Sequence, residues 1–195
     1  TDAGTPAISD PGEDLVRLCA ENGVEVRAIP GCCAAVNALA VSGLPTGRFT
    51  FEGFLTVNKK SRREHLNSLK GETRTMIFHE APHKLCTTLN DLTEAFGPDR
   101  RISLCRELTK LHEEVLRFTL AEAVAYYEEN APKGEYVLVV AGVAPKTGAV
   151  VTLEDGVAQV LALKEQGMRL KDAAKEVAEH TGLSKNELYA AALER

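Results

Sequence analysis

The hydrophobic pattern along the chain points first to one buried strand, which begins at Thr75 and reads Thr-Met-Ile-Phe before the residues become polar. Pro82 ends this strand, and leucines at helical spacing predict a helix over His83–Phe96. Proteins of the α/β class place their binding sites where a strand passes through a loop into a helix. The polar residues beside this loop are His79, Glu80 and His83. We therefore expect groups that move protons or bind ligands to gather there.

A second loop of the same kind follows the strand predicted at Arg101–Cys105, and its polar residues run over Arg106–Lys110. The pattern around both loops predicts that residues 46–144 form a C-terminal α/β lobe, a mixed sheet covered by helices. The other predicted elements of this lobe are a strand at Phe49–Leu55, a basic and then amphipathic helix ending at Leu69, a strand at Val115–Phe118, a helix at Leu120–Glu129 and a strand at Tyr136–Val140.

The pattern of residues 1–45 predicts that they form the remainder of an N-terminal α/β lobe with a parallel sheet. The chain opens with a loop rich in Gly, Pro and Asp, and because such loops usually follow a strand we expect this lobe to be incomplete. Asp10 is predicted to cap a helix whose first position is Pro11. The inner face of that helix is expected to contain Leu15, Leu18 and Cys19. A short strand at Val24–Ile29 and a helix at Ala34–Val41 follow.

The pattern after Val143 is helical only, with Pro145–Ala149 as a linker and residues 150–195 as a helical C-terminal domain. Its helices are predicted over Leu153–Gln166, Leu170–His180 and Lys185–Leu193. Ser184 and Glu187 form a predicted capping box. The last two helices have the order of a helix-turn-helix, but their basic residues are nearly matched by acidic ones. We therefore favour an accessory packing bundle over a nucleic-acid reader.

The composition is that of an ordinary globular protein, with 195 residues, 44% hydrophobic and 26% charged. No apolar run reaches the roughly 20 residues of a membrane-spanning helix and no leader-like segment opens the chain, so we expect a cytoplasmic protein. The five cysteines contain no C-x-x-C pair, which favours buried reduced thiols over disulfides or a zinc site. A net charge of −5 disfavours nonspecific coating of nucleic acid, yet Lys59–Arg63 is a local basic cluster.

One motif suggests a metal site and is rejected on physical grounds. His79–His83 reads H-E-x-x-H, the zinc signature, which needs one helix through all five residues. The proline inside it costs roughly 3 kcal/mol in a helix interior, so we expect no metal. A P-loop and G-x-G-x-x-G are also absent from the sequence. Structural roles stay open for Glu80, as acceptor of helix amides, and for Arg106, as ion-pair partner of Glu107 or Glu113.

Short motifs follow one another along the chain and carry a resemblance. They are Asp2–Pro6 with Ile8–Gly12, Pro30-Gly31, Gly43–Pro45, Phe51–Phe54, Phe78–His83, Arg106–Glu113 and Lys133–Val137. In this order they resemble the tetrapyrrole methylase fold family and, within it, the methyltransferases of small-subunit ribosomal RNA. The resemblance implies an α/β, two-lobed tetrapyrrole-methylase-like fold, with the first lobe incomplete and a small C-terminal helical appendix.

The resemblance also implies an activity: transfer of a methyl group from S-adenosylmethionine to the ribose 2'-hydroxyl of a cytidine in the decoding region of 16S rRNA, by a homodimer. The residues that it places in the cofactor cleft are Asp2, Ala3, Gly4, Thr5, Cys33, Ala34, Phe78, Leu108 and Tyr136. For handling the proton we favour Glu80 and His83. We expect Arg106 and Lys110 to orient phosphate or ribose, and Glu113 to fix one of these bases.

The basic cluster provides the expected RNA contact, because cationic side chains follow the phosphate backbone. Its residues are Lys59, Lys60, Arg62 and Arg63. Two alternatives stay open: a methyltransferase of the same fold that acts on a tetrapyrrole or another small acceptor, and a truncated, non-catalytic binding module. The family has a portion of the cofactor cleft before the position of Thr1. We therefore expect residues 1–195 alone to bind S-adenosylmethionine weakly or not at all and to be inactive.

Overall fold

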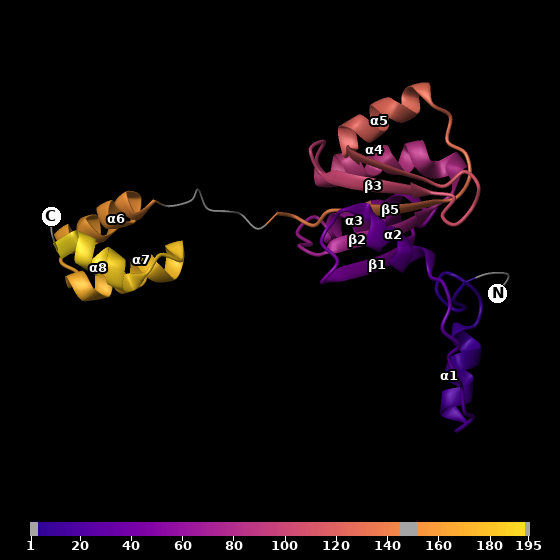
Figure 1. Cartoon of the computed structure of the whole chain (residues 1–195), viewed down its shortest axis with the longest axis horizontal. Coiled ribbons are helices and arrows are strands. Elements are labelled where there is room, and N and C mark those ends of the chain that lie inside the picture. Colours follow the sequence, from indigo (N-terminus) through magenta and orange to yellow (C-terminus); the bar gives the residue numbers. More distant parts are fainter. Residues whose placement is uncertain (1–3, 145–151, 194–195) are drawn as a thin grey trace. The chain divides into compact units, whose positions relative to one another are not determined.

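The computed structural model describes residues 4–144 and 152–193 and divides into two compact units, Thr1–Ala144 and Pro145–Arg195 (Figure 1). The boundary between the units lies at the start of the predicted linker, Pro145–Ala149, which is outside the described residues. Each unit has a hydrophobic core of its own. The further division of the first unit at residue 45 stays a prediction.

The first unit is built on a five-stranded sheet in the order β1-β2-β5-β3-β4. Its strands are β1 (Phe49–Phe54), β2 (Thr75–Glu80), β3 (Arg101–Arg106), β4 (Glu114–Thr119) and β5 (Tyr136–Val140). The pair β1 and β2 is parallel, whereas the other neighbouring pairs are antiparallel. The last strand in sequence therefore lies at the centre of the sheet, between β2 and β3. The predicted mixed sheet is confirmed.

Helices pack on both faces of this sheet (Figure 1). The helices of the unit are α1 (Glu13–Glu21), α2 (Ala34–Ser42), α3 (Lys59–Ser68), the 3-10 turn η1 (Pro82–Lys84), α4 (Leu85–Phe96) and α5 (Leu120–Glu129). Strand residues alternate between the faces, so that Phe78 and Leu138 pack with α3, α4 and α5, and Ile77 and Val139 pack with α2. Across both described ranges, no helix is long and apolar enough to cross a membrane.

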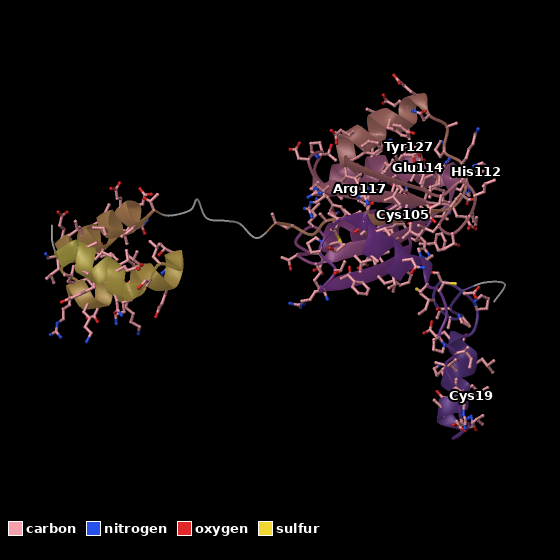
Figure 2. The ribbon with its side chains drawn as sticks, viewed as in Figure 1. Cys19, Cys105, His112, Glu114, Arg117 and Tyr127 are labelled. Carbon is pink, nitrogen blue, oxygen red and sulfur yellow. The ribbon has the colours of Figure 1, made fainter. Side chains whose placement is uncertain are left out.

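Arg117 of β4 ties α2 to the sheet (Figure 2). Its Nε donates to the carbonyl of Ser42 at 3.0 Å, and its Nη2 donates to the carbonyl of Val41. Both carbonyls lie at the helix C-terminus, where intrahelical partners run out and the helix dipole favours a positive charge. The helix then ends at Gly43, whose φ is 77°. These bonds fix α2 on the sheet and so fix the position of its first turn.

The start of α1 corrects the sequence prediction. The helix begins at Glu13, and its N-cap is Gly12, whose φ of 135° lies outside the helical region. The predicted cap at Asp10 with Pro11 in the first turn is therefore wrong. The helix also has no buried residue, and Leu15 on its predicted inner face is 65% exposed. The helix has the amphipathic spacing, but within the described residues no apolar surface covers its apolar face.

Residues 24–29 do not form the predicted strand. A strand is stable only where its backbone N–H and C=O groups pair with a neighbour, and no described strand pairs with this segment. The side chains of Val24, Val26 and Ile29 are all exposed. The parallel sheet predicted for residues 1–45 is therefore not formed by the described part of the chain, because alternation gives a strand only when a pairing edge is present.

The second unit consists of the three predicted helices, α6 (Leu153–Glu165), α7 (Leu170–Thr181) and α8 (Lys185–Leu193). Its core is formed by small and branched side chains: Val157, Val160, Ala173, Ala174, Val177, Leu188 and Ala192. The predicted capping contact at Ser184 is present in one direction, since its Oγ accepts from the N–H of Glu187 at 3.5 Å. A reciprocal capping box forms instead between Thr152 and Asp155 at the start of α6.

Leu89 of α4 provides a test of the sheet's main core, because its side chain is fully buried against β2 and α5 residues. We expect Leu89→Ala to lower the free energy of unfolding of the first unit by about 3 kcal/mol through lost burial and a new cavity. Urea denaturation measures this change. Leu111→Ala is the matched control, because Leu111 is 92% exposed and should change stability by less than about 0.5 kcal/mol. Equal effects of the two changes would contradict the assigned core.

Candidate functional site

A cavity of about 650 Å³ opens at the edge of the sheet where β2 and β3 end and β5 begins. Because β5 is antiparallel to both neighbours, Tyr136 at its start pairs with Glu80 at the end of β2 and with Arg106 at the end of β3. The two polar loops that the sequence singled out therefore meet at one cavity. Strand carboxyl ends are the usual place for ligands in α/β sheets.

The loop preceding α1 and the first turn of α2 complete the cavity wall. Thr5 Oγ1 donates to the carbonyl of Cys32 at 3.1 Å, and a Cβ added to Gly4 would lie 3.1 Å from the same oxygen. This close approach, together with a φ of 78°, requires glycine at position 4. The predicted cofactor residues that line the cavity are Gly4, Thr5, Cys33, Ala34, Leu108 and Tyr136. Asp2 and Ala3 lie outside the described residues.

The size and chemistry of the cavity fit a small organic ligand. Its volume falls within the roughly 300–1,000 Å³ typical of such sites. Apolar wall residues such as Leu108 and Val137 alternate with the Thr5 hydroxyl and with the backbone at the start of α2, whose first N–H groups have no intrahelical partner. A ligand with an apolar ring, hydroxyls and charged ends would find a partner for each part.

Phe78 does not line this cavity. Its side chain is fully buried in the core formed with α4 and α5. Strand alternation explains the difference, because Ile77 and His79 point to the face of α2 and the cavity, whereas Phe78 points to the opposite face. Its predicted contact with the cofactor stays a prediction, and the geometry gives it a packing role.

Glu80 lines the cavity, but its carboxylate is already engaged. Oε2 accepts from the hydroxyl of Thr88 in α4 at 2.6 Å, and Oε1 accepts from the N–H of Ala81 at 2.8 Å. The residue is 4% exposed. These bonds fasten the end of β2 to α4, the kind of structural role that the sequence left open. A proton-handling role for Glu80 stays a prediction.

The turn after β3 is held by three carboxylates and one lysine. Lys110 Nζ lies 2.9 Å from Glu107 Oε1 and 2.9 Å from Glu135 Oε2. Glu113 Oε2 accepts from the N–H of Thr109 at 2.6 Å. The bonds from the Glu135 N–H and from Lys110 lower the pKa of Glu107, while Glu135 and Glu107 raise the pKa of Lys110. Lys110 therefore reaches the cavity as part of an ion-pair network.

Three of the predicted catalytic residues lie away from the cavity wall. Arg106 is paired with Glu114, at 3.4 Å between Nε and Oε2, and not with either neighbour suggested by the sequence. Glu113 holds the turn, and His83 is exposed in η1. His79 to His83 span the end of β2 and a 3-10 turn, so the H-E-x-x-H residues do not share one helix. Within the described ranges, no group of His, Cys, Asp and Glu is arranged to hold a metal.

His79 is the cavity residue to which the sequence assigned no role of its own. Its ring packs edge-on against Phe51 and Phe54, at 5.2 and 5.4 Å between centroids. Both phenylalanines reach one face because β1 has an irregularity at Gly53 that shifts the register by one residue. Nε2 of His79 is buried without a hydrogen-bond partner in the described part of the chain, and burial lowers the pKa of the ring. The sequence motif related to this packing of His79 is F-E-G-F at Phe51–Phe54, which supplies both phenylalanines.

Unusual backbone conformations gather at the same place. Among the described residues, the non-glycine positions with positive φ are Ala7, Ser9, Glu107 and Thr109. Ser9, Glu107 and Thr109 all line the cavity. L-residues adopt such angles rarely, and strained positions concentrate where a site must be held in one geometry. This concentration supports the cavity as the candidate functional site independently of any motif, and no pattern in the sequence marks it.

The predicted RNA-binding residues lie at the start of α3, beside a smaller cavity of about 180 Å³ between α3 and α4. Lys59, Arg62, Arg63 and also Lys70 line it. Arg62 Nε is 2.7 Å from Asp91 Oδ2 but is not aligned as a hydrogen bond, so the contact is an ion pair. Both side chains of this pair are largely buried. Arg62 is thus committed to α4, whereas Lys60 and Arg63 are exposed.

The cysteines differ from the expectation of buried thiols. All five are free; Cys105 is buried, but Cys32 and Cys86 are exposed. Cys105 lies on β3 within the first unit (Figure 2), and burial raises the pKa of its thiol. The prediction is therefore wrong for Cys32 and Cys86. Cys32 is exposed because it belongs to the loop that forms the cavity wall.

Each of the two units matches a known protein family. Tetrapyrrole (corrin/porphyrin) methylases match residues 1–124, and the RsmI C-terminal helix-turn-helix domain matches residues 151–195. Ribosomal RNA small subunit methyltransferase I of Synechocystis is 45% identical over all of this chain and 70% of its own length. The proteins of that name from Escherichia coli O157:H7 and Mycobacterium tuberculosis are 43% and 45% identical, with 68% and 67% of their lengths covered.

Solved structures show the same fold at lower identity. The methyltransferase CobJ superposes with a TM-score of 0.55 and 23% identity, covering 72% of this chain and 62% of its own. Cobalt precorrin-4 methyltransferase CbiF gives a TM-score of 0.51 at 16% identity, covering 71% of this chain and 61% of its own. This chain therefore spans less than two thirds of either structure. At these identities the likeness concerns the fold alone.

The lowered pKa of His79 predicts a pH-dependent stability. Because the unfolded ring binds a proton more readily than the folded one, stability is full above the ordinary pKa of 6.5 and falls as pH decreases through the window below it. The slope due to one group cannot exceed about 1.4 kcal/mol per pH unit. We expect His79→Gln to lose less stability than the wild type between pH 7.5 and pH 5.5 in urea denaturation. The same loss in both proteins would show that His79 is not buried uncharged.

Proposed function

This chain belongs to the ribosomal RNA small subunit methyltransferase I family of the tetrapyrrole methylases, and we propose that its cavity binds S-adenosylmethionine for methyl transfer to 16S rRNA. The observation that carries the proposal is the single cavity at which the family's motifs meet, at the ends of β2 and β3 and the start of β5. The acceptor is a cytidine 2'-hydroxyl in the decoding region. The working form is a cytoplasmic homodimer on the assembled small subunit.

The residues that would hold the cofactor come from three segments. Gly4 and Thr5 supply one wall, the first turn of α2 at Cys33 and Ala34 supplies backbone donors, and Leu108 and Tyr136 close the opposite side. Asp2, Ala3 and Phe78 remain predicted contacts. S-adenosylmethionine supplies an activated methyl group on a sulfonium, so the protein has mainly to align the acceptor and remove its proton.

Removal of the acceptor proton needs an unprotonated base at the cavity wall. Glu80 and His83 were expected to provide it, but the carboxylate of Glu80 already accepts two bonds and His83 is exposed. His79 meets the requirement better, because it lines the cavity and its lowered pKa keeps the ring uncharged near neutral pH. Lys110, through its ion-pair network, would orient the acceptor from the second loop. Arg106, paired with Glu114 away from the cavity wall, remains a predicted contact.

Methyl transfer to small ribosomal subunits that lack the modification tests the function directly. With the full-length natural protein and labelled S-adenosylmethionine, we expect label on a cytidine ribose of 16S rRNA and none on a tetrapyrrole precursor offered separately. The 195-residue chain is expected to give little or no transfer and weak cofactor binding by calorimetry. Label only in the tetrapyrrole would make the small-acceptor alternative correct. Label in neither acceptor would overturn the proposal.

The basic cluster of α3 predicts a salt-dependent affinity for the subunit. Lys59, Lys60 and Arg63 are the residues to change, because removing Arg62 would leave Asp91 unpaired in a largely buried position. We expect the triple change to alanine to weaken binding and to reduce the slope of log affinity against log salt by about 0.7 to 0.9 per lost phosphate contact.

A triple change of Lys164, Lys171 and Lys175 to alanine is the control for net charge. It removes the same charge from exposed positions of the second unit. We expect its slope to stay close to that of the wild type. Equal slopes for the α3 variant and the wild type would remove the α3 cluster from the RNA contact.

A further inference from the structure

We propose that Glu107, to which the sequence assigned no role in the site, is a positioning residue that holds the cavity wall formed by Leu108, Thr109 and Lys110 in its binding geometry. The inference rests on the proposed function, because that wall is the one assigned to the cofactor. Glu107 directly follows β3 and lines the cavity itself. Its side chain reaches the segment that leads into β5 and accepts a hydrogen bond there from the N–H of Glu135.

Glu107 takes part in four hydrogen bonds, two with Glu135 in the segment before β5 and two with Lys110 within the turn after β3. Its N–H donates to the carbonyl of Glu135 at 3.0 Å, and its Oε1 accepts from the N–H of Glu135 at 2.8 Å. Oε1 also accepts from Lys110 Nζ at 2.9 Å, and its carbonyl accepts from the N–H of Lys110 at 3.0 Å. One residue therefore fixes the start of β5 and closes the turn after β3.

The turn needs such a fastening because its backbone is strained. Glu107 has a φ of 49° and Thr109 a φ of 66°. A β-branched residue such as Thr109 adopts positive φ only where the surroundings over-determine it. Leu108 is placed against the cavity between these two residues, so its position depends on both angles. If the bonds of Glu107 are lost, the turn can relax to ordinary angles and Leu108 is no longer held at the wall.

Gly134 provides an independent observation of the same constraint. A Cβ added there would lie 2.5 Å from Glu107 Cγ and 2.6 to 2.7 Å from its carboxyl atoms. The side chain could escape only by giving up its bonds to Glu135 and Lys110. Glycine at position 134 is thus needed to leave room for the carboxylate, beyond what its φ of 78° requires.

A double-mutant cycle on the full-length natural protein tests the proposal, with S-adenosylmethionine affinity measured by calorimetry. We expect Glu107→Ala and Gly134→Ala each to weaken binding by about tenfold or more. The double variant should bind within about twofold of Glu107→Ala, because the Cβ added at position 134 then meets no carboxylate. Glu107→Gln keeps an acceptor for the Glu135 N–H and should restore most of the affinity. Gly97→Ala is the control, since Gly97 has a φ of 90° and no atom within 4 Å of an added Cβ.

Wild-type affinity in Glu107→Ala, or losses that multiply in the double variant, would overturn the proposal. Thermal unfolding of each variant separates a general loss of stability from a loss of cofactor affinity. Amide exchange of Lys110 and Glu135 gives a second measurement that needs no ligand, and both amides should exchange faster in Glu107→Ala and Gly134→Ala. If the wild type fails to bind S-adenosylmethionine, the proposed function fails, and exchange alone still decides whether Glu107 holds the wall. Unchanged exchange would overturn that assignment.

Discussion

The insertion of β5 between β2 and β3 is the constraint on which the rest of the first unit depends. Every residue of β5 is buried, and it pairs antiparallel with both neighbours. Because backbone groups in the interior must be paired, this strand cannot shift without unpairing both sides. The same pairing aligns the ends of β2 and β3 with the start of β5. The cavity is thus a direct consequence of strand order.

Two kinds of contact then give the cavity its shape. Buried and partly buried hydrogen bonds hold one side, where Arg117 fastens the C-terminus of α2 and Glu80 fastens the end of β2 to α4. A polar network holds the other, where Glu107 keeps a strained turn in place. Charged networks of this kind add little to global stability at an exposed edge but fix local geometry. This division fits a site whose walls must be held in position around a ligand.

Secondary structure in the first unit followed from local pattern wherever the segment also had a partner. The helix Leu120–Glu129 and the strand Tyr136–Val140 have the predicted bounds. Residues 24–29 had an equally clear alternation and form no strand, because among the described residues no edge pairs with them. The predicted cap of α1 at Asp10 failed because the backbone leaves the helical region as late as Gly12, so that the helix begins only at Glu13.

The sequence by itself determined the class of fold, the two loops that carry the site and the family to which the chain belongs, because hydrophobic periodicity and motif order are local properties. The tertiary structure alone decided which residues of those loops face the cavity. Phe78 turned to the core by strand parity, and His79 turned to the cavity beside two phenylalanines brought together by a bulge. Gly134 and Glu107, far apart in the chain, became neighbours only through strand pairing, which residue order does not encode locally.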